Sequence, residues 1–310
     1  MIPTRDRPEM VVTAVLSVLS QTFDQLEVIV VDDGSTTPAT DSLARVDDPR
    51  LRIERLESPA GVAEARNRGI AVARGGLIGF CDDDDEWLPT LLERLVEALA
   101  TAPDGNGSRP TVAFCNSVIT EVEAGTSWIH RASAGYLDTL ATALYAPRPY
   151  LSATLAPRDL FSIHGGFDPD LRNFQDYDLL LRWAASGVRT VAVDDALFIR
   201  NYHLASLSNR HESHMRSEAI LQEKWLPAVT DAVGPLRARR WAARRWVQHL
   251  SGRVERDLAR GDRRSAVGAI VAMTPHVWAA PGKGLRCVAK TALGLDAYRR
   301  VVASVGRGTA

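Results

Sequence analysis

Residues 77–89 read "LIGFCDDDDEWLP", an apolar run that passes through Cys81 into four successive aspartates. A short apolar run that stops at acids is typical of a parallel strand buried on both faces. The four carboxylates, residues 82–85, repel one another at the end of such a strand, so their charge must be offset. Solvent offsets it if the run is an exposed loop, and a divalent cation offsets it because hard cations prefer oxygen ligands.

A second stretch, "LEVIVVDDGS" at residues 26–35, has the same pattern. Its apolar run stops at Asp32 and Asp33. The carboxyl ends of parallel strands meet at one edge of an open sheet, and ligands bind at this edge. Two strands that both deliver acids there favour a binding site over incidental surface polarity.

The segments around these strands predict an alternation of strands and helices. Residues 10–19 and 61–74 have the apolar spacing of helices, and the pair Gly75-Gly76 ends the second one. Pro89 stands where helices often begin, and a leucine-rich stripe follows it. Through residue 100 the order is therefore βαβαβα, which predicts a doubly wound α/β sheet with functional loops at the strand ends.

The pattern is less regular beyond residue 110. Residues 111–120 and 189–203 read as strands, and a helix is expected from about Tyr177. The segment 121–150 has no clean periodicity. From about residue 214 onward the pattern is helical, with arginines on the helix faces. The sequence thus predicts an α/β domain followed by a helical extension.

Composition bounds the class of protein. The chain has 310 residues, of which 45% are hydrophobic and 24% charged, as in ordinary soluble globular proteins. A net charge of −1 gives no sign of a polyanionic partner, so no nucleic acid is expected. Three widely spaced cysteines argue against a disulfide framework and suit a reducing compartment, which favours a cytoplasmic location. No apolar run approaches the roughly 18–20 residues that span a bilayer.

Residues 237–264 are a separate electrostatic feature. They hold ten arginines against three acids, a local net charge of +7, so the rest of the chain carries −8. Two interpretations remain open for this segment. It is a packed helical cap on the preceding domain, or it is a basic, tryptophan-bearing helix that makes peripheral contact with the inner face of a membrane. The cap is favoured because arginine and tryptophan also pack well inside proteins.

Six segments, in order and spacing, resemble glycosyltransferase family 2, and the resemblance covers residues 1 to about 210. The segments are "IPTRDR" (2–7), "LSVLSQTF" (16–23), "LEVIVVDDGST" (26–36), "GVAEARNRGIAVARGG" (61–76), "IGFCDDDDEWLP" (78–89) and "GGFDPDLRNFQDYDLLLRW" (165–183).

The resemblance implies the GT-A fold, a Rossmann-like, mixed and mainly parallel sheet flanked by helices. It also implies an inverting enzyme of cell-surface polysaccharide or glycoconjugate synthesis. Such an enzyme moves a sugar from a UDP-, GDP- or dTDP-linked donor to a hydroxyl of a glycan or lipid-linked acceptor. The catalytic domain would span residues 1–212, with a nucleotide-sugar-binding half at 1–110 and an acceptor-binding half at 111–212. A helical, Arg-rich extension would follow at 213–310.

Positions that match the family's motifs imply the roles of individual residues. Donor binding falls to Thr4, Asp33, Arg66, Asp82, Asp83 and Arg200. The Asp82-x-Asp84 pair resembles the family's DxD motif, which implies Mn²⁺ or Mg²⁺ held by Asp84, with His203 as a further metal ligand. Asp85 and Trp87 would shape the loop. The repulsion within the acidic run would then be relieved partly by the ion and partly by arginine and hydroxyl partners.

The matched position of Asp176, in "FQDYDL", implies the general base. An inverting transfer needs a carboxylate opposite the leaving diphosphate, where it accepts the proton of the attacking hydroxyl. Two features depart from the family's pattern. Gln175 replaces the usual Glu, and only Met1-Ile2 precede "PT" where a longer apolar strand is usual, so either the start is late or the first strand is truncated.

Two other functions are compatible with parts of this pattern. A non-catalytic relative would bind nucleotide or glycan, and Gln175 with the short first strand would mark its decay. A nucleotidyltransferase has a similar sheet, but its phosphate loop is rich in glycine. The corresponding stretch here, "PTRDRPE", has no glycine, so this alternative ranks last.

Overall fold

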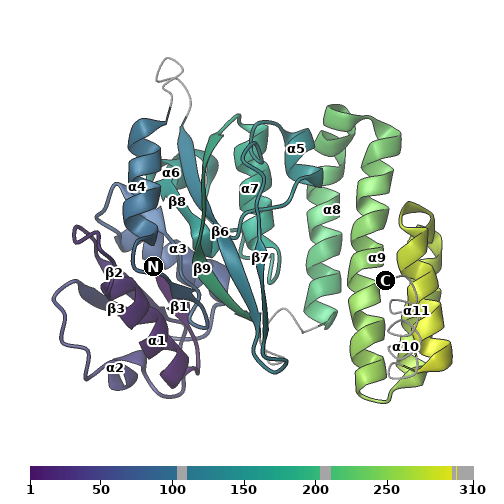
Figure 1. The fold of residues 1–310 in the computed structure, drawn as a ribbon, viewed down its shortest axis with the longest axis horizontal. Helices are drawn as coiled ribbons and strands as arrows, with labels where there is room; N and C mark the ends of the chain where they lie inside the picture. The colour runs from purple at the N-terminus through teal and green to yellow at the C-terminus, as the bar shows by residue number, and fades with distance from the viewer. Residues whose placement is uncertain (103–109, 203–210, 295–297, 299–310) are drawn as a thin grey trace, which may run out of the picture. The chain divides into compact units, whose positions relative to one another are not determined.

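The computed structural model describes residues 1–102, 110–202, 211–294 and 298. The chain divides into two compact units, Met1–Asn209 (unit 1) and Arg210–Ala310 (unit 2), shown as ribbons in Figure 1. Unit 1 combines sheets with helices, and the described part of unit 2 is helical.

Unit 1 begins with a parallel sheet of three strands in the order β1-β2-β3. Every residue of β2 is buried, as expected for a strand with β-branched side chains that is covered on both faces. Pro8 opens α1 at the position where its missing N–H costs nothing, and α1 and α3 both pack on this sheet. The elements are β1 (Ile2–Thr4), α1 (Pro8–Leu19), β2 (Val28–Asp32), α2 (Ala39–Ser42), β3 (Leu51–Arg55) and α3 (Val62–Val72).

The second sheet of unit 1 has six strands in the order β4-β8-β6-β9-β5, with β7 added on β6. The β6–β9 pair is parallel, and the other four pairs in this sheet are antiparallel. Its strands are β4 (Leu77–Gly79), β5 (Glu86–Trp87), β6 (Thr111–Glu121), β7 (Thr126–His130), β8 (Thr154–Pro157) and β9 (Arg189–Tyr202). Its helices are α4 (Leu91–Thr101), α5 (Leu140–Tyr145), η1 (Leu151–Ala153), α6 (Asp159–His164) and α7 (Gln175–Ala185).

This arrangement confirms the mixed α/β fold, although its antiparallel part is larger than the βαβ alternation indicates. One antiparallel pair corrects the prediction of a buried parallel strand at residues 77–80, because β4 pairs antiparallel with β8 and its Leu77 is exposed. The side chains of β7 are mostly exposed, so this edge strand lacks the alternation of a half-buried strand. A second difference concerns α7, which begins at Gln175 rather than near Tyr177.

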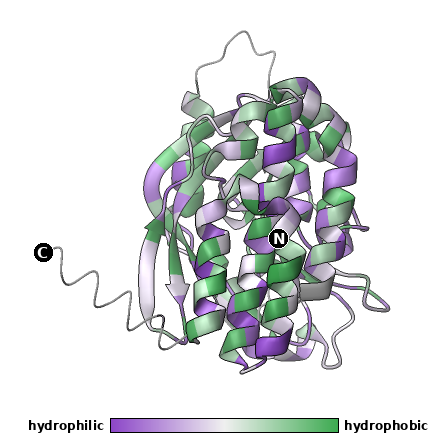
Figure 2. Ribbon diagram, turned by 90° about the vertical axis from the view of Figure 1, so that its right-hand side faces the viewer, coloured by the Kyte–Doolittle hydropathy of each residue, from purple (hydrophilic) through white to green (hydrophobic). Residues whose placement is uncertain are grey.

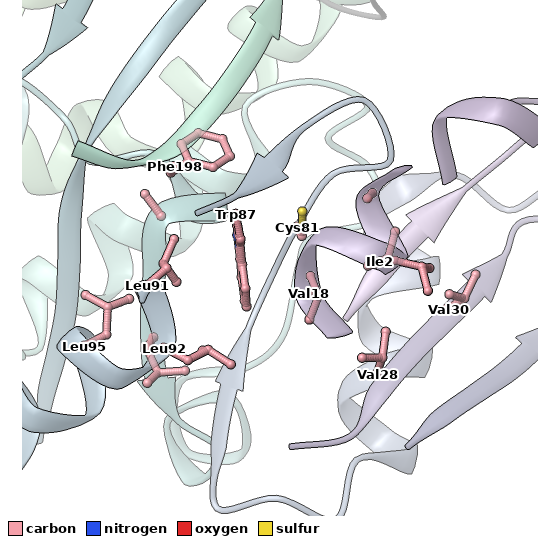
Figure 3. Close-up of a cluster of buried hydrophobic side chains, with 14 of the residues drawn as sticks. Ile2, Val18, Val28, Val30, Cys81, Trp87, Leu91, Leu92, Leu95 and Phe198 are labelled. Atoms are coloured by element: carbon pink, nitrogen blue, oxygen red, sulfur yellow. The ribbon is translucent and has the colours of Figure 1, made fainter. Parts of the chain in front are cut away.

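Trp87 joins the acidic loop to the core. Its indole is buried beside Phe198 and Leu91, and Figure 3 shows Cys81 on its other side. The indole N–H donates to the carbonyl of Ser152 at 2.7 Å. Gly79 is required here, because a Cβ on it would lie 2.9 Å from the indole. The loop that carries the four aspartates therefore returns to the sheet at a fixed place.

Unit 2 is built around its longest helix, α9, on which the other helices pack. Its core is lined by Val247, Leu250 and Val254 of α9 and by small or flexible residues of the helices that follow. The elements are α8 (His211–Val233), α9 (Pro235–Ala259), α10 (Arg263–Met273), η3 (Thr274–Ala279) and α11 (Pro281–Leu293). Among the residues that the structure describes, no helix offers a stretch both long and apolar enough to cross a lipid bilayer.

A buried ionic cluster ties α8 to α9. The carboxylate of Glu218, which is fully buried, accepts hydrogen bonds from Arg245 at 2.6 and 2.7 Å and pairs with the His249 ring at 3.1 Å. Burial opposes its ionisation, but the bonds from His249 and Arg245 prevail and lower the pKa of Glu218 to about 2. Its charge is therefore matched inside unit 2.

Replacing Glu218 tests this cluster. Glu218→Gln should lower the free energy of unfolding by roughly 3 kcal/mol near neutral pH, because Arg245 loses its counter-charge. The pKa of Glu218 is depressed in the folded state, so this contribution is complete above the ordinary pKa of 4.5 and fades as the pH falls toward 2. Urea denaturation at several pH values measures it.

Glu255→Gln is the matched control. Glu255 pairs with Lys290, but its side chain is 52% exposed, so its loss should cost at most about 1 kcal/mol. Equal effects of the two substitutions would contradict the assignment of a special role to Glu218.

Candidate functional site

Arg7, at the start of α1, neutralises the middle of the acidic run. One nitrogen of its guanidinium, Nη1, donates to Asp83 Oδ1 at 2.7 Å and to Asp84 Oδ2 at 2.8 Å. The hydroxyl of Thr4, at the end of β1, donates to Asp83 Oδ2 at 2.7 Å. Both oxygens of Asp83 thus have partners from the first eight residues of the chain, which lie beside the acidic loop.

Asp82 is held by Arg66 of α3. Arg66 Nη2 donates to Asp82 Oδ1 at 2.5 Å, while the Asp82 side chain keeps 38% of its surface exposed. The guanidinium of Arg66 is buried over the ring of Phe167, 5.3 Å from the ring centroid. Among the described residues, its Nε has no hydrogen-bond partner. A buried donor without a partner suits a polar ligand.

Asp85 has a different environment from the other three acids. It is buried and accepts a hydrogen bond from the backbone N–H of Asn201, on β9, at 3.1 Å. The side chain of Asn201 donates to the carbonyl of Asp84 at 3.0 Å. These bonds fasten the acidic loop to the second sheet.

Burial raises the pKa values of three carboxylates in this run despite the nearby arginines. Burial raises the pKa of Asp83 to about 6, against the opposing effect of Arg7. Burial also raises the pKa of Asp84, with the charge of Asp82 adding to the effect. Burial and the charges of Asp82 and Asp84 raise the pKa of Asp85 well above its ordinary value. Each carboxylate would ionise more readily if a further cation lay beside it.

Arg200, on β9, supplies another positive charge from the second sheet. Its guanidinium lies over the ring of Tyr150, 4.7 Å from the ring centroid. Burial opposes its charged form, yet Tyr150, Asp85 and Asp82 together raise the pKa of Arg200. Arg200 therefore stays charged next to the acidic run.

Asp176 lies in the first turn of α7. Phe174, the N-cap residue two positions before Asp176, has φ 66°, a left-handed conformation that is rare outside glycine and often found at functional sites. Arg148 Nη1 lies 3.2 Å from Asp176 Oδ2. Burial disfavours the carboxylate, but the charges of Arg148 and Arg66 outweigh it and lower the pKa of Asp176. The side chain is thus ionised at neutral pH while a quarter of its surface remains exposed, at 25%.

Arg66 and Arg200 connect the two groups of carboxylates. Both act electrostatically on Asp176, and Arg66 also bonds Asp82 while Arg200 also acts on Asp85. Charges act strongly only over short distances at physiological ionic strength. Segments about ninety residues apart in the sequence therefore form one site.

Most of the residues implied by the sequence lie together. The site unites Thr4, Arg66, Asp82, Asp83, Asp84, Asp176 and Arg200. Asp33 has other partners. Its carboxylate accepts from the backbone N–H groups of Ala60, at 2.7 Å, and Gly61, at 3.0 and 3.1 Å. These bonds fix the loop before α3, and the role of Asp33 at the nucleoside stays a prediction. His203 lies outside the described residues.

The sequence did not single out Arg7, Arg148 or Tyr150. Arg7 lies within the quoted "IPTRDR" segment, and the need to offset four carboxylates pointed to arginine partners without identifying them. Arg148 and Tyr150 fall in or beside the segment that lacks periodicity. Only the fold brings them to the site, where Arg148 meets Asp176 and Tyr150 meets Arg200.

The donor set fits a hard divalent cation. Asp82 and Asp84 offer partly exposed carboxylate oxygens, with side-chain exposures of 38% and 15%. Within the described ranges, no group of three His, Cys, Asp or Glu is arranged as a complete metal site. Mg²⁺ needs no such group, since it is usually bound by one or two carboxylates together with water and substrate phosphates.

A family model for glycosyl transferase family 2 matches residues 1–135. Residues 1–135 therefore carry a family 2 glycosyltransferase domain. Among curated relatives, the putative colanic acid biosynthesis glycosyl transferase WcaA of Escherichia coli is 26% identical over 196 residues. That match covers 58% of this chain and 63% of WcaA, so the chain spans less than two thirds of this relative.

Two solved structures have a similar fold. TarS of S. aureus, in complex with UDP-GlcNAc, aligns with a TM-score of 0.61 at 17% identity over 99% of this chain and 90% of its own. The mannosyltransferase PcManGT of Pyrobaculum calidifontis, in complex with GDP-Man and Mn²⁺, aligns at 0.54 and 20% identity over 94% and 85%. These likenesses confirm the GT-A fold, and the family model confirms the family 2 resemblance.

Replacing Arg148 tests the electrostatics of Asp176. Arg148→Gln removes the nearest positive charge, so the pKa of Asp176 should rise from its depressed value. Carboxyl ¹³C NMR titration measures this change. Arg131→Gln is the control, since Arg131 pairs with the exposed Asp194 and not with Asp176. An Asp176 titration unchanged in Arg148→Gln would refute the pairing.

Proposed function

We propose that this chain is an inverting, metal-dependent glycosyltransferase that moves a sugar from a nucleotide diphosphate-sugar to an acceptor hydroxyl. The observation that supports the proposal is that Arg66 and Arg200 act electrostatically on both the acidic run and Asp176. An inverting transfer needs two functions close together. One group of residues holds the leaving diphosphate, and a carboxylate removes the proton of the incoming hydroxyl.

In this proposal the aspartates have different roles. Asp84, with Asp82 beside it, holds Mn²⁺ or Mg²⁺, which when bound neutralises charge on the diphosphate. Arg66 and Arg200 offer positive charge to the same leaving group. Thr4, Asp33 and Asp83 serve the nucleoside and donor sugar. His203, outside the described residues, is proposed as a further metal ligand.

Asp176 is the proposed base. It accepts the acceptor's proton as the hydroxyl oxygen bonds to C1 of the sugar and the bond from C1 to the diphosphate oxygen breaks. Arg148 keeps Asp176 ionised, so it is ready to receive the proton at neutral pH. Gln175 lies next to it with a buried Oε1 that has no partner among the described residues, and this atom suits a hydroxyl of a substrate.

The donor and acceptor are proposed only as classes. The related structures hold UDP-GlcNAc in TarS and GDP-Man in PcManGT, which supports a nucleotide-linked sugar without choosing its base. The name of WcaA, a colanic acid biosynthesis protein, supports a role in polysaccharide or glycoconjugate synthesis with a glycan or lipid-linked acceptor. Residues 1–110 would form the donor half, 111–212 the acceptor half, and 213–310 the helical extension.

A cytoplasmic location remains part of the proposal, supported by three cysteines that are all unpaired. Membrane contact through residues 237–264 has weaker support. Trp241 is buried, the indole of Trp246 donates to Gln222 at 3.1 Å, and Arg245 pairs with Glu218. These side chains serve packing within unit 2, as expected of a packed helix.

Thermal shift measurements test donor and metal binding. UDP, GDP or dTDP with Mn²⁺ should raise the melting temperature, because a ligand at 100 times its Kd stabilises by about 2.7 kcal/mol. Asp84→Asn should abolish this shift, whereas Asp47→Asn, in an exposed loop, should leave it intact. No shift with any of the nucleotides would count against the proposal.

Turnover measurements test the base. Asp176→Asn should lower kcat/KM for sugar transfer or donor hydrolysis by about 10²–10⁴-fold while leaving the nucleotide-induced thermal shift unchanged. Asp170→Asn, exposed in the loop before α7, is the control. If the wild-type chain binds nucleotide but turns over no donor, the non-catalytic alternative replaces this function.

A further inference from the structure

Among the described residues of unit 2, the outer faces of α10, η3 and α11 carry apolar side chains that are exposed. Five large hydrophobic residues there, Val267, Val271, Trp278, Leu285 and Val288, are between 49% and 71% exposed, and Leu293 at the end of α11 is 49% exposed as well. Figure 2 turns these helices toward the viewer and shows hydrophobic segments, in green, along helices that also bear hydrophilic ones. Scattered exposed hydrophobic residues are ordinary, but several on adjoining helices form a patch that needs an explanation.

The spacing of these residues makes the patch regular. Val267 and Val271 are four residues apart on α10, and Leu285 and Val288 are three apart on α11, so each pair shares a helix face. The opposite faces of the same helices form the core of unit 2 through Ala266, Ala269, Met273 and Cys287. Both helices therefore have two apolar faces, and only one of them is used for packing.

Basic residues border this patch, and acids are absent from it. Residues 263–293 contain five Lys and Arg but no Asp or Glu. Four of the five basic residues are exposed, namely Arg263, Arg264, Lys283 and Arg286. Together with the five hydrophobic residues they define the α10–α11 surface.

Of the nearest acids among the described residues, Glu255 and Asp257 pair with cations, and the exposed Asp262 offsets only one of the basic charges. Glu255 pairs with Lys290, and Asp257 accepts from Arg253 and from the hydroxyl of Ser265. Asp262 caps α10 by accepting from the N–H of Ser265 at 2.9 Å. The α10–α11 surface thus combines exposed aliphatic and tryptophan side chains with net positive charge.

We propose that the α10–α11 surface binds the headgroup region of an anionic lipid bilayer. Aliphatic side chains and tryptophan enter the boundary between headgroups and acyl chains, while arginine and lysine contact anionic lipids. A soluble polyanion would pair with the arginines but leave five hydrophobic residues in water. The lipid surface matches both chemistries, and α10 and α11 pack side by side, so both helices can lie in its plane.

This surface lies mostly outside residues 237–264, for which a packed cap was favoured over membrane contact, and it shares only Arg263 and Arg264 with that segment. The tryptophans of α9 are engaged in packing, whereas Trp278 of η3 is exposed. The inference does not depend on the transfer reaction, because lipid binding and sugar transfer are measured separately.

Vesicle flotation of the full chain tests the proposal. The protein should float with vesicles of phosphatidylcholine and phosphatidylglycerol, float poorly with phosphatidylcholine alone, and be released at high salt. The double variant Arg264→Gln/Lys283→Gln should bind about 30-fold more weakly, since each basic residue near an anionic surface is worth a factor of about 5. Arg239→Gln/Arg240→Gln is the matched control, because it removes the same charge from exposed positions of α9.

The Arg239→Gln/Arg240→Gln control distinguishes binding by the α10–α11 surface from attraction by the overall positive charge of unit 2. Equal weakening by both double variants would overturn the proposal, since the excess charge of unit 2 as a whole would then explain binding. Absence of flotation with anionic vesicles would overturn it as well.

A second pair of variants tests the apolar part. Leu285→Ser should weaken vesicle binding roughly tenfold, whereas Ile163→Ser, which removes an equally exposed side chain from α6 of unit 1, should have no effect. Both positions are exposed, so circular dichroism should show unchanged folding. Light scattering tests the rival occupant, a second copy of the chain. If Leu285→Ser converts a dimer to a monomer and leaves vesicle binding unchanged, the surface is a dimer interface and the proposal fails.

Discussion

The site depends on arginines that reach an acidic loop from other parts of the chain. Four carboxylates in succession would repel one another at the end of β4, and three of them are largely buried. Arg7 comes from α1, Arg66 from α3 and Arg200 from β9, so the first sheet, its helices and the second sheet all contribute a counter-charge. The loop is stable only in the folded domain, because no local segment provides these partners. Folding therefore assembles the charge pattern and the site in one step.

The same arrangement leaves the site prepared for a charged ligand. Burial, with the neighbouring aspartates adding to its effect, raises the pKa values of these carboxylates. A cation beside them would offset both effects, and oriented charges that need no reorganisation are a strong source of electrostatic catalysis. Asp176 has the opposite balance, since arginines outweigh its burial and hold its pKa down. Aspartates of the same site thus differ in pKa because their partners differ. This difference allows one residue type to serve two functions.

The sequence predicted elements whose patterns are local. The buried strand β2, the amphipathic helix α1 and the acidic loop after β4 were all readable from apolar runs and their stops. It could not predict pairings that depend on distant segments. The contact of Arg148 with Asp176 and the antiparallel pairs of β8 arise only when the chain closes on itself. Matching the sequence motifs predicted more of the site residues than hydrophobic periodicity did. Asp176, for example, lies in a helix whose apolar pattern gives no sign of a general base.

Unit 2 shows why amino-acid composition alone cannot tell which side chains form a binding surface. Its run of arginines and tryptophans suited both a packed helix and a membrane-binding helix, because these side chains have an apolar body and a polar end. The burial of each side chain shows whether it packs inside unit 2 or faces outward. Arg245 and Trp241 of α9 lie inside, beside Glu218 and the neighbouring helices, while Trp278, Arg264 and Lys283 lie outside. Within the described part of unit 2, α10 and α11 are the α-helices with the fewest charges. All the charges they carry are basic, so these two helices present an apolar and basic surface.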